Sequence, residues 1–146
     1  MLYRLAYFSH ARLSDSDTNP QDQLRQILLT ARRNNAERHI TGALLSTDRY
    51  FAQVLEGEED RVKALYQQIC RDPRHERLTI LSAGEIAERQ FGRWSMRHLT
   101  GDASARDAIS QLAMHLPQTS DGQAARSLLA TMADMVTSPP LSETHV

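Results

Sequence analysis

The order of short periodic segments over the first hundred residues restricts the fold more than any other feature of this chain. Strand-like runs occur at 2–9, 39–47, 50–57, 77–83 and 90–99, and helix-like runs occur at 20–36 and from Glu59 to Asp72. Alternation with a period of two indicates strands, and apolar residues at i, i+3, i+4 and i+7 indicate amphipathic helices. The sequence therefore predicts an α+β fold of the ferredoxin-like type, a β-α-β-β-α-β-β sandwich with both helices on one face of a mixed sheet.

Polar pairs mark two of the boundaries between these segments. Asp48 and Arg49 leave only a tight connection between two strand-like runs, which predicts a hairpin over 39–57. Asp72 precedes Pro73 and is expected to end the second helix, because the residue before a proline disfavours the helical conformation.

Beyond residue 100 the strand-like pattern gives way to two helical stripes, over 104–115 and 122–136. These two additional C-terminal helices are predicted to cover the face of the sheet that the first two helices leave open. The end of the chain, with two prolines, predicts a disordered tail. The expected organisation is a principal domain at 1–100, a C-terminal helical segment at 101–137 and a disordered tail at 138–146.

The composition excludes several classes of protein. Of the 146 residues 24% are charged, and the formal net charge of -1 gives no strong positive field that attracts nucleic acid or an anionic membrane. Cys70 is the only cysteine, which allows no internal disulfide and no cysteine zinc cluster. The sequence has no apolar run of the ~18 residues that a membrane helix needs and no signal peptide at its start, so a cytoplasmic location is expected.

The sequence also lacks the motifs of common catalytic sites, so no enzymatic activity is expected. It has no His-Glu-x-x-His helix, Walker loop, Gly-x-Gly-x-x-Gly turn or Gly-x-Ser-x-Gly elbow. The acidic residues Glu56, Glu58, Glu59 and Asp60 are interpreted as a solvated turn, because charged residues are rarely buried. No metal site is predicted.

Three polar side chains fall on faces that the periodicity predicts to be buried. Tyr7 is in the middle of a strand, and Gln53 shares a strand face with Phe51, whereas Glu56 marks the opposite face as the less buried one. A register shifted by one residue places Gln53 in solvent instead. Asn35 extends the apolar stripe of the first helix, but it equally suits a helix C-terminal cap. Tyr7, Gln53 and Asn35 facing one cavity suit a flat heteroaromatic ligand.

Two further pairs allow both a structural and a functional interpretation. Trp94 and Met96 share a face of the fifth predicted strand, which usually reflects core packing. Arg74 and His75 follow the proline that ends the second helix. An arginine there either binds a phosphate in bidentate fashion or remains a solvated loop charge.

Six short segments, taken in order, resemble one family of sensor domains. They are L-A-Y-F-S (5–9), A-R-R-N-N-A (31–36), I-T-G-A-L-L (40–45), F-A-Q-V-L-E-G (51–57), D-P-R-H (72–75) and R-Q-F-G-R-W-S-M (89–96). Their order and spacing over residues 2–98 are similar to those of the BLUF domain, a blue-light sensor that uses FAD. The resemblance implies the fold predicted above, with the flavin between the two helices and its ring edge toward the sheet.

The resemblance implies a photochemical role for four residues. Tyr7 matches the photoactive tyrosine and Gln53 the switching glutamine, with Trp94 and Met96 near that glutamine. Light is expected to make Tyr7 pass an electron and a proton toward the flavin, with Gln53 as the relay. Gln53 then returns rearranged, with a new hydrogen bond to the flavin C4 carbonyl, which gives a small red shift without chemical turnover.

The remaining cofactor contacts are implied on the first helix and after the second. Asn35 and Asn34 resemble the residues that contact the flavin ring. Asp72, Arg74 and His75 lie in the segment that lines the ribityl and phosphate end in the family.

The resemblance is to short, stand-alone members, which act on a separate signalling protein. The fifth strand and the helices at 104–136 are the expected route of the signal, and a dimer is the expected assembly. Two alternatives are a flavin-dependent redox enzyme and a chromophore-free ferredoxin-like interaction module. Bound flavin excludes the module, and photocycling without a substrate argues against the enzyme.

Overall fold

The described part of the chain follows the predicted succession of strands and helices. The computed structural model describes residues 1–11, 20–47, 50–72, 75–92, 96–100, 109 and 128–133. The elements are β1 (Leu2–Ala11), α1 (Pro20–Glu37), β2 (Thr41–Ser46), β3 (Tyr50–Glu58), α2 (Glu59–Cys70), β4 (His75–Glu85) and β5 (Arg97–Thr100). The ferredoxin-like α+β class and the β-α-β-β-α-β-β order are therefore confirmed.

One five-stranded sheet carries the arrangement, in the order β4-β1-β3-β2-β5. Neighbouring strands are antiparallel except β2 and β5, which are parallel. Gly42 allows β2 to approach β3 closely, because a Cβ atom at this position would collide with the carbonyl oxygen of Val54. The register of β1 on β3 places Tyr7 directly opposite Gln53.

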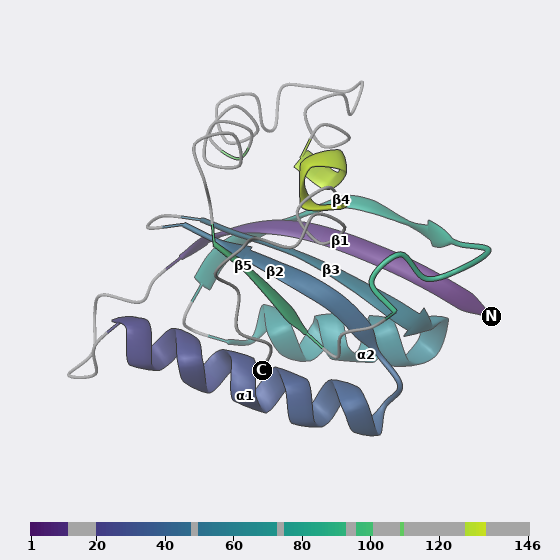
Figure 1. The fold of residues 1–146 in the computed structure, drawn as a ribbon, viewed down its shortest axis with the longest axis horizontal. Helices are drawn as coiled ribbons and strands as arrows, with labels where there is room; N and C mark the ends of the chain where they lie inside the picture. The colour runs from purple at the N-terminus through teal and green to yellow at the C-terminus, as the bar shows by residue number, and fades with distance from the viewer. Residues whose placement is uncertain are drawn as a thin grey trace, which may run out of the picture.

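The side chains of the sheet form two buried clusters, one on each face. Both α1 and α2 lie on one face (Figure 1), where Leu44 and Leu55 belong to the buried cluster. The helical residues 128–133, drawn in yellow in Figure 1, lie on the other face, and Met132 is buried in the same cluster as Val54. The C-terminal part of the chain thus contributes to the core on the face that α1 and α2 do not cover.

The end of α1 decides between the two interpretations of Asn35. His39, rather than Asn35, adopts the left-handed conformation, with a φ of 56°. The N–H of Ile40 donates to the carbonyl oxygen of Asn35 at 2.8 Å, and the N–H of His39 donates to that of Ala36 at 3.3 Å, the pattern of a Schellman motif. The interpretation of Asn35 as the cap is therefore wrong. Asn35 belongs to the last turn of the helix, and its side chain is buried.

One expectation about the sheet is wrong. Glu56 is fully buried rather than solvated, so the second face of β3 is as well covered as the first. The short fifth strand expected within residues 90–99 occupies Arg97–Thr100. The N–H groups of Gln90 and Phe91 donate to the carboxylate of Glu56, at 2.9 Å each, instead of to a neighbouring strand.

Several predicted features fall outside the described residues. These are the connection at Asp48 and Arg49, the residues Arg74 and Trp94, most of the helices at 104–115 and 122–136, and the tail at 138–146. The domain boundaries near residues 100 and 137 stay predictions. None of the helices in the described part of the chain has the length and apolar character that a membrane crossing requires.

Candidate functional site

The centre of the site is a buried hydrogen bond between β1 and β3. Alternation along each strand directs Tyr7 and Gln53 to the face that carries α1 and α2, and the register places them opposite each other. The hydroxyl of Tyr7 donates to Oε1 of Gln53. Tyr7 is only 3% exposed and Gln53 6%. Burial raises the pKa of Tyr7 far above its ordinary value of 10, so the phenol remains a proton donor at every physiological pH.

The amide nitrogen of Gln53 faces a sulfur atom. Its Nε2 donates to Sδ of Met96 at 3.4 Å, and Met96 is fully buried just before β5. A thioether is a weak acceptor, and a glutamine amide carries two N–H donors. Within the described part of the chain Gln53 therefore has donor capacity that a stronger acceptor on a ligand can take.

Two further rings enclose the side chain of Tyr7. The ring of Tyr66, on α2, has its centroid 5.6 Å away, and that of His75, at the start of β4, lies edge-on at 6.0 Å. Nε2 of His75 lies 2.7 Å from the carbonyl oxygen of Ile69, which only accepts, so this nitrogen carries a hydrogen. Nδ1 lies 2.9 Å from Oγ of Ser9. These two bonds fix the His75 ring against the phenol.

The polar groups on the helix side come from the second half of α1. Nε of Arg32 donates to the carbonyl oxygen of Met96 at 3.0 Å, so α1 holds the chain where β5 begins. Asn35 is buried and lies three positions later, on the same side of the helix as Arg32. Asn34 is half-buried. No sequence signal distinguishes Arg32 from Arg33, its exposed neighbour, because only the tertiary contact separates them.

The predicted site residues fall into three groups. The structure brings together Tyr7, Gln53, Met96 and His75. At the ends of the two helices lie Asn34, Asn35 and Asp72. Outside the described residues lie Arg74 and Trp94. Among the side chains that the structure describes, no group of three or more His, Cys, Asp or Glu is placed to hold a metal ion.

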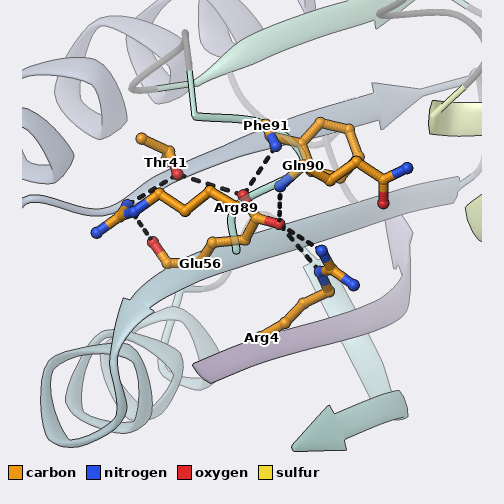
Figure 2. Close-up of polar contacts among 6 residues, drawn as sticks. All are labelled: Arg4, Thr41, Glu56, Arg89, Gln90 and Phe91. Carbon is orange, nitrogen blue, oxygen red and sulfur yellow. Dashed lines mark hydrogen bonds and ion pairs between the residues drawn. The ribbon is translucent and has the colours of Figure 1, made fainter. Parts of the chain in front are cut away.

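A second buried polar cluster, on the opposite face of β3, was missed by sequence reasoning. The carboxylate of Glu56 accepts hydrogen bonds from Nε and Nη2 of Arg4 at 3.0 and 2.8 Å (Figure 2). It also accepts the backbone N–H groups of Gln90 and Phe91, and Thr41 donates its hydroxyl at 3.4 Å. Alternation along the strands puts Arg4 and Glu56 on one face with opposite charges, and this was the available signal.

Comparison with known proteins identifies the family. A sequence model of BLUF domains, described as sensors of blue-light using FAD, matches residues 2–97. The chain belongs to the BLUF family. BLUF domains are flavin-binding blue-light sensors, and the site described above lies wholly within the matched residues.

Curated relatives share the domain but are much longer proteins. "Blue light- and temperature-regulated antirepressor BluF" of Escherichia coli (strain K12) is 35% identical over 111 residues, 76% of this chain and 27% of that protein. "Photoactivated adenylate cyclase subunit beta" of Euglena gracilis is 37% identical over 120 residues, 77% of this chain and 13% of that protein. The chain thus spans about a quarter or less of the length of these relatives.

Solved BLUF structures of similar length match almost the whole chain. "BlsA photo-activated state" has a TM-score of 0.77 and 30% identity, with 91% of this chain and 95% of that chain covered. "BlrB - a BLUF protein, dark state structure" has a TM-score of 0.75 and 29% identity, with 91% and 96% covered.

Proposed function

We propose that this BLUF chain binds FAD, senses blue light through Tyr7 and Gln53, and signals to a separate protein without catalysing a reaction of its own. The observation that supports the proposal is the buried series Tyr7, Gln53 and Met96, joined by hydrogen bonds across β1, β3 and the start of β5. In this series a proton donor faces an amide that is itself weakly held.

The residues present suit a flavin. Gln53 has an N–H donor to spare among the described groups, and a flavin ring offers carbonyl and ring-nitrogen acceptors. Asn35 and Asn34, at the end of α1, suit the polar edge of the ring. Asp72, Arg74 and His75 match the segment that lines the ribityl and phosphate end in the family, and an arginine pairs with phosphate. FAD and FMN both carry phosphate, so the choice of FAD is supported by the family alone.

The residues of the chain perform the switch by moving a proton and turning an amide. When bound, the flavin supplies an absorber of blue light whose excited state is a strong oxidant. Tyr7 gives up an electron, and its proton passes to Oε1 of Gln53 along the existing hydrogen bond. Gln53 rearranges before the electron and proton return to Tyr7, so no bond is formed or broken overall.

The signal is the rearranged hydrogen-bond network. After the return, the amide of Gln53 presents a donor where it previously presented an acceptor, which shifts the absorption slightly to the red and alters its bond to Met96. A coupling of about 1–3 kcal/mol is typical for such a signal between two sites. The longer relatives named for an antirepressor and an adenylate cyclase indicate that the output is a change in a partner's activity.

The partner, the assembly and the location of this protein are also part of the proposal. We propose a separate signalling protein as the partner rather than nucleic acid or a membrane, because the net charge is only -1. A homodimer is the proposed assembly, since two-fold symmetry is the commonest in soluble proteins. The cytoplasm is the proposed location.

The test is the absorption spectrum of the purified protein, recorded in the dark and after blue light. The expected result is a flavin spectrum that moves slightly to the red and recovers in the dark. Mass spectrometry of the released cofactor then separates FAD from FMN. A flavin spectrum that bleaches only with an added substrate favours a redox enzyme, and a protein that takes up no flavin favours an interaction module.

A further inference from the structure

The Glu56 cluster joins four separate parts of the chain through one buried carboxylate. Figure 2 shows Arg4 on β1, Thr41 on β2 and the segment 89–91 converging on Glu56 of β3. Nη1 of Arg89 completes the arrangement, with bonds to Thr41 Oγ1 at 2.9 Å and to the Glu56 carbonyl oxygen at 3.0 Å. Glu56 therefore binds the segment 89–91 in two ways. Its carboxylate accepts hydrogen bonds from the N–H groups of Gln90 and Phe91, and its carbonyl oxygen accepts one from the side chain of Arg89.

The fastened segment and the photoactive residues lie on opposite faces of the sheet. Phe91 is buried in the cluster with Leu128 and Met132, whereas Met96 is buried with Tyr7 on the face of α1 and α2. Met96 is five residues after Phe91 and directly precedes β5. If Phe91 stays in place, less of a displacement of Met96 is taken up on that side and more of it is passed to β5.

The β5 end leads directly to the C-terminal residues. Leu99 of β5 belongs to the same buried cluster as Ile109, Leu128 and Met132. A shift of β5 therefore changes what the helical residues 128–133 pack against.

We infer that Glu56 is a positioning residue that holds the backbone of Gln90 and Phe91 in place. A change at Gln53 and Met96 is then passed to β5 and residues 128–133 instead of to Phe91. The inference rests on the proposed photochemical function. Glu56 holds Gln90 and Phe91 through charge-assisted hydrogen bonds, which are about twice as strong as neutral ones. The bond from Gln53 to the thioether of Met96 is the weaker one and yields first.

The first measurement uses the unmodified, flavin-loaded chain. Amide hydrogen exchange, followed by NMR in the dark and under steady blue light, compares Gln90 and Phe91 with β5 and with 128–133. The expected result is unchanged, slow exchange at Gln90 and Phe91, and light-dependent exchange at β5 and 128–133. Exchange at Phe91 that rises with light as much as that of β5 overturns the inference.

The absorption spectrum of the same sample tests the proposed photochemistry separately from the proposed role of Glu56. A red shift with no light-dependent exchange at 128–133 overturns the role of Glu56 and leaves the photochemistry intact. The absence of a red shift overturns both.

The second measurement uses Glu56→Gln, which keeps the shape but replaces one acceptor oxygen by a donor. The red shift is expected to persist, because Glu56 lies on the face away from Tyr7 and Gln53. The Phe91 amide is expected to exchange at least about tenfold faster, as for the loss of a hydrogen bond to a charged group. The light-dependent change at 128–133 is expected to disappear, and its persistence overturns the inference.

Two control variants distinguish the positioning role of Glu56 from a general loss of stability. Arg4→Gln removes the ion pair but leaves the carboxylate on Gln90 and Phe91, so the light-dependent change at 128–133 is expected to remain. Val54→Ala weakens the apolar cluster that contains Phe91 and Met132 but leaves Glu56 unchanged. This variant is also expected to retain the light-dependent change at 128–133. If either control variant loses the light-dependent change as Glu56→Gln does, the loss reflects reduced stability and not the positioning role of Glu56. The wild-type measurement decides the question if Glu56→Gln does not fold.

Discussion

Gln53 and Glu56 are buried polar residues on the same strand, yet their surroundings are opposite in kind. Gln53 is neutral and bonds to a phenol and a thioether on the face of α1 and α2. Glu56, on the other face, is charged and bonds to Arg4 and to two backbone N–H groups. Because β3 alternates, side chains three positions apart point to different layers, and the strand carries both without contact between them.

The difference agrees with the proposed roles, in which Gln53 rearranges and Glu56 stays in place. A buried amide whose donors meet only a weak acceptor loses little when it rearranges. A buried carboxylate held by a guanidinium and main-chain donors loses several bonds at once if it is displaced, and each such group left unsatisfied costs about 1–3 kcal/mol. On these grounds one strand can carry both the proposed switch and the proposed fixed residue.

Removing the phenol is expected to have the largest effect, because it eliminates the switch. Tyr7→Phe keeps the ring in the pocket but removes the donor to Gln53, so the light-induced red shift is expected to vanish while flavin remains bound. Dark and light difference spectra measure this. Tyr66→Phe is the matched control, since its ring is 5.6 Å from Tyr7 but makes no described bond to Gln53, and it should retain the shift. A normal red shift in Tyr7→Phe contradicts the role of Tyr7.

The free energy of unfolding can be compared after each polar pair, Tyr7 with Gln53 or Arg4 with Glu56, is replaced by apolar residues. Tyr7→Phe with Gln53→Leu is expected to change it by no more than about 1 kcal/mol, because both partners of a neutral bond are removed together. Arg4→Leu with Glu56→Leu is expected to lose about 2–4 kcal/mol, because the N–H groups of Gln90 and Phe91 remain without the carboxylate.

Chemical denaturation of flavin-free protein measures both double variants, so that a change in flavin affinity does not add to the result. Equal losses in the two variants mean that the Glu56 cluster holds the fold no more firmly than the photoactive pair does.

The weak bond to Met96 is expected to have a kinetic effect. Met96→Leu keeps the apolar volume but removes the acceptor of Gln53 Nε2, which destabilises the observed arrangement relative to the lit state. Recovery in the dark is therefore expected to slow by up to about fivefold, equivalent to ~1 kcal/mol. Leu99→Met, on β5 but facing the opposite side of the sheet from Met96, is expected to leave recovery unchanged. Recovery at the wild-type rate in Met96→Leu means that the sulfur does not hold the amide.

Local periodicity predicted buried positions for Tyr7 and Gln53, with a solvent-exposed Gln53 as the alternative. The structure shows that both side chains are buried. Their proposed photochemical roles came from the resemblance to BLUF domains and not from the periodicity. The register that places them opposite each other comes from the pairing of β1 with β3. That pairing is fixed by residues far apart in the sequence.

Periodicity failed where a partner arrives from a distant part of the chain. Glu56 was assigned to the less buried face because it is charged, but Arg4 and the amides of Gln90 and Phe91 make its burial favourable. Of the two alternatives for Asn35, the buried position is confirmed and the cap is wrong, because the helix continues beyond Asn35 to the left-handed turn at His39.

Acid is expected to produce the smallest effect, and on the photoactive face. His98 lies on that face with Nε2 2.8 Å from Ser46 Oγ, and burial, followed by the charge of Arg32, lowers its pKa below the ordinary 6.5. Between pH 6.5 and this lowered pKa the unfolded chain binds a proton that the folded chain does not, so stability falls as the pH decreases over this range and levels off below it. His98→Gln should flatten the dependence of Tm on pH in this range. His10→Gln is the comparison, because the pKa of His10 is also lowered, by burial and Arg77, on a more exposed side chain. A larger flattening in His10→Gln contradicts this assignment and moves the acid sensitivity away from His98 and the photoactive face.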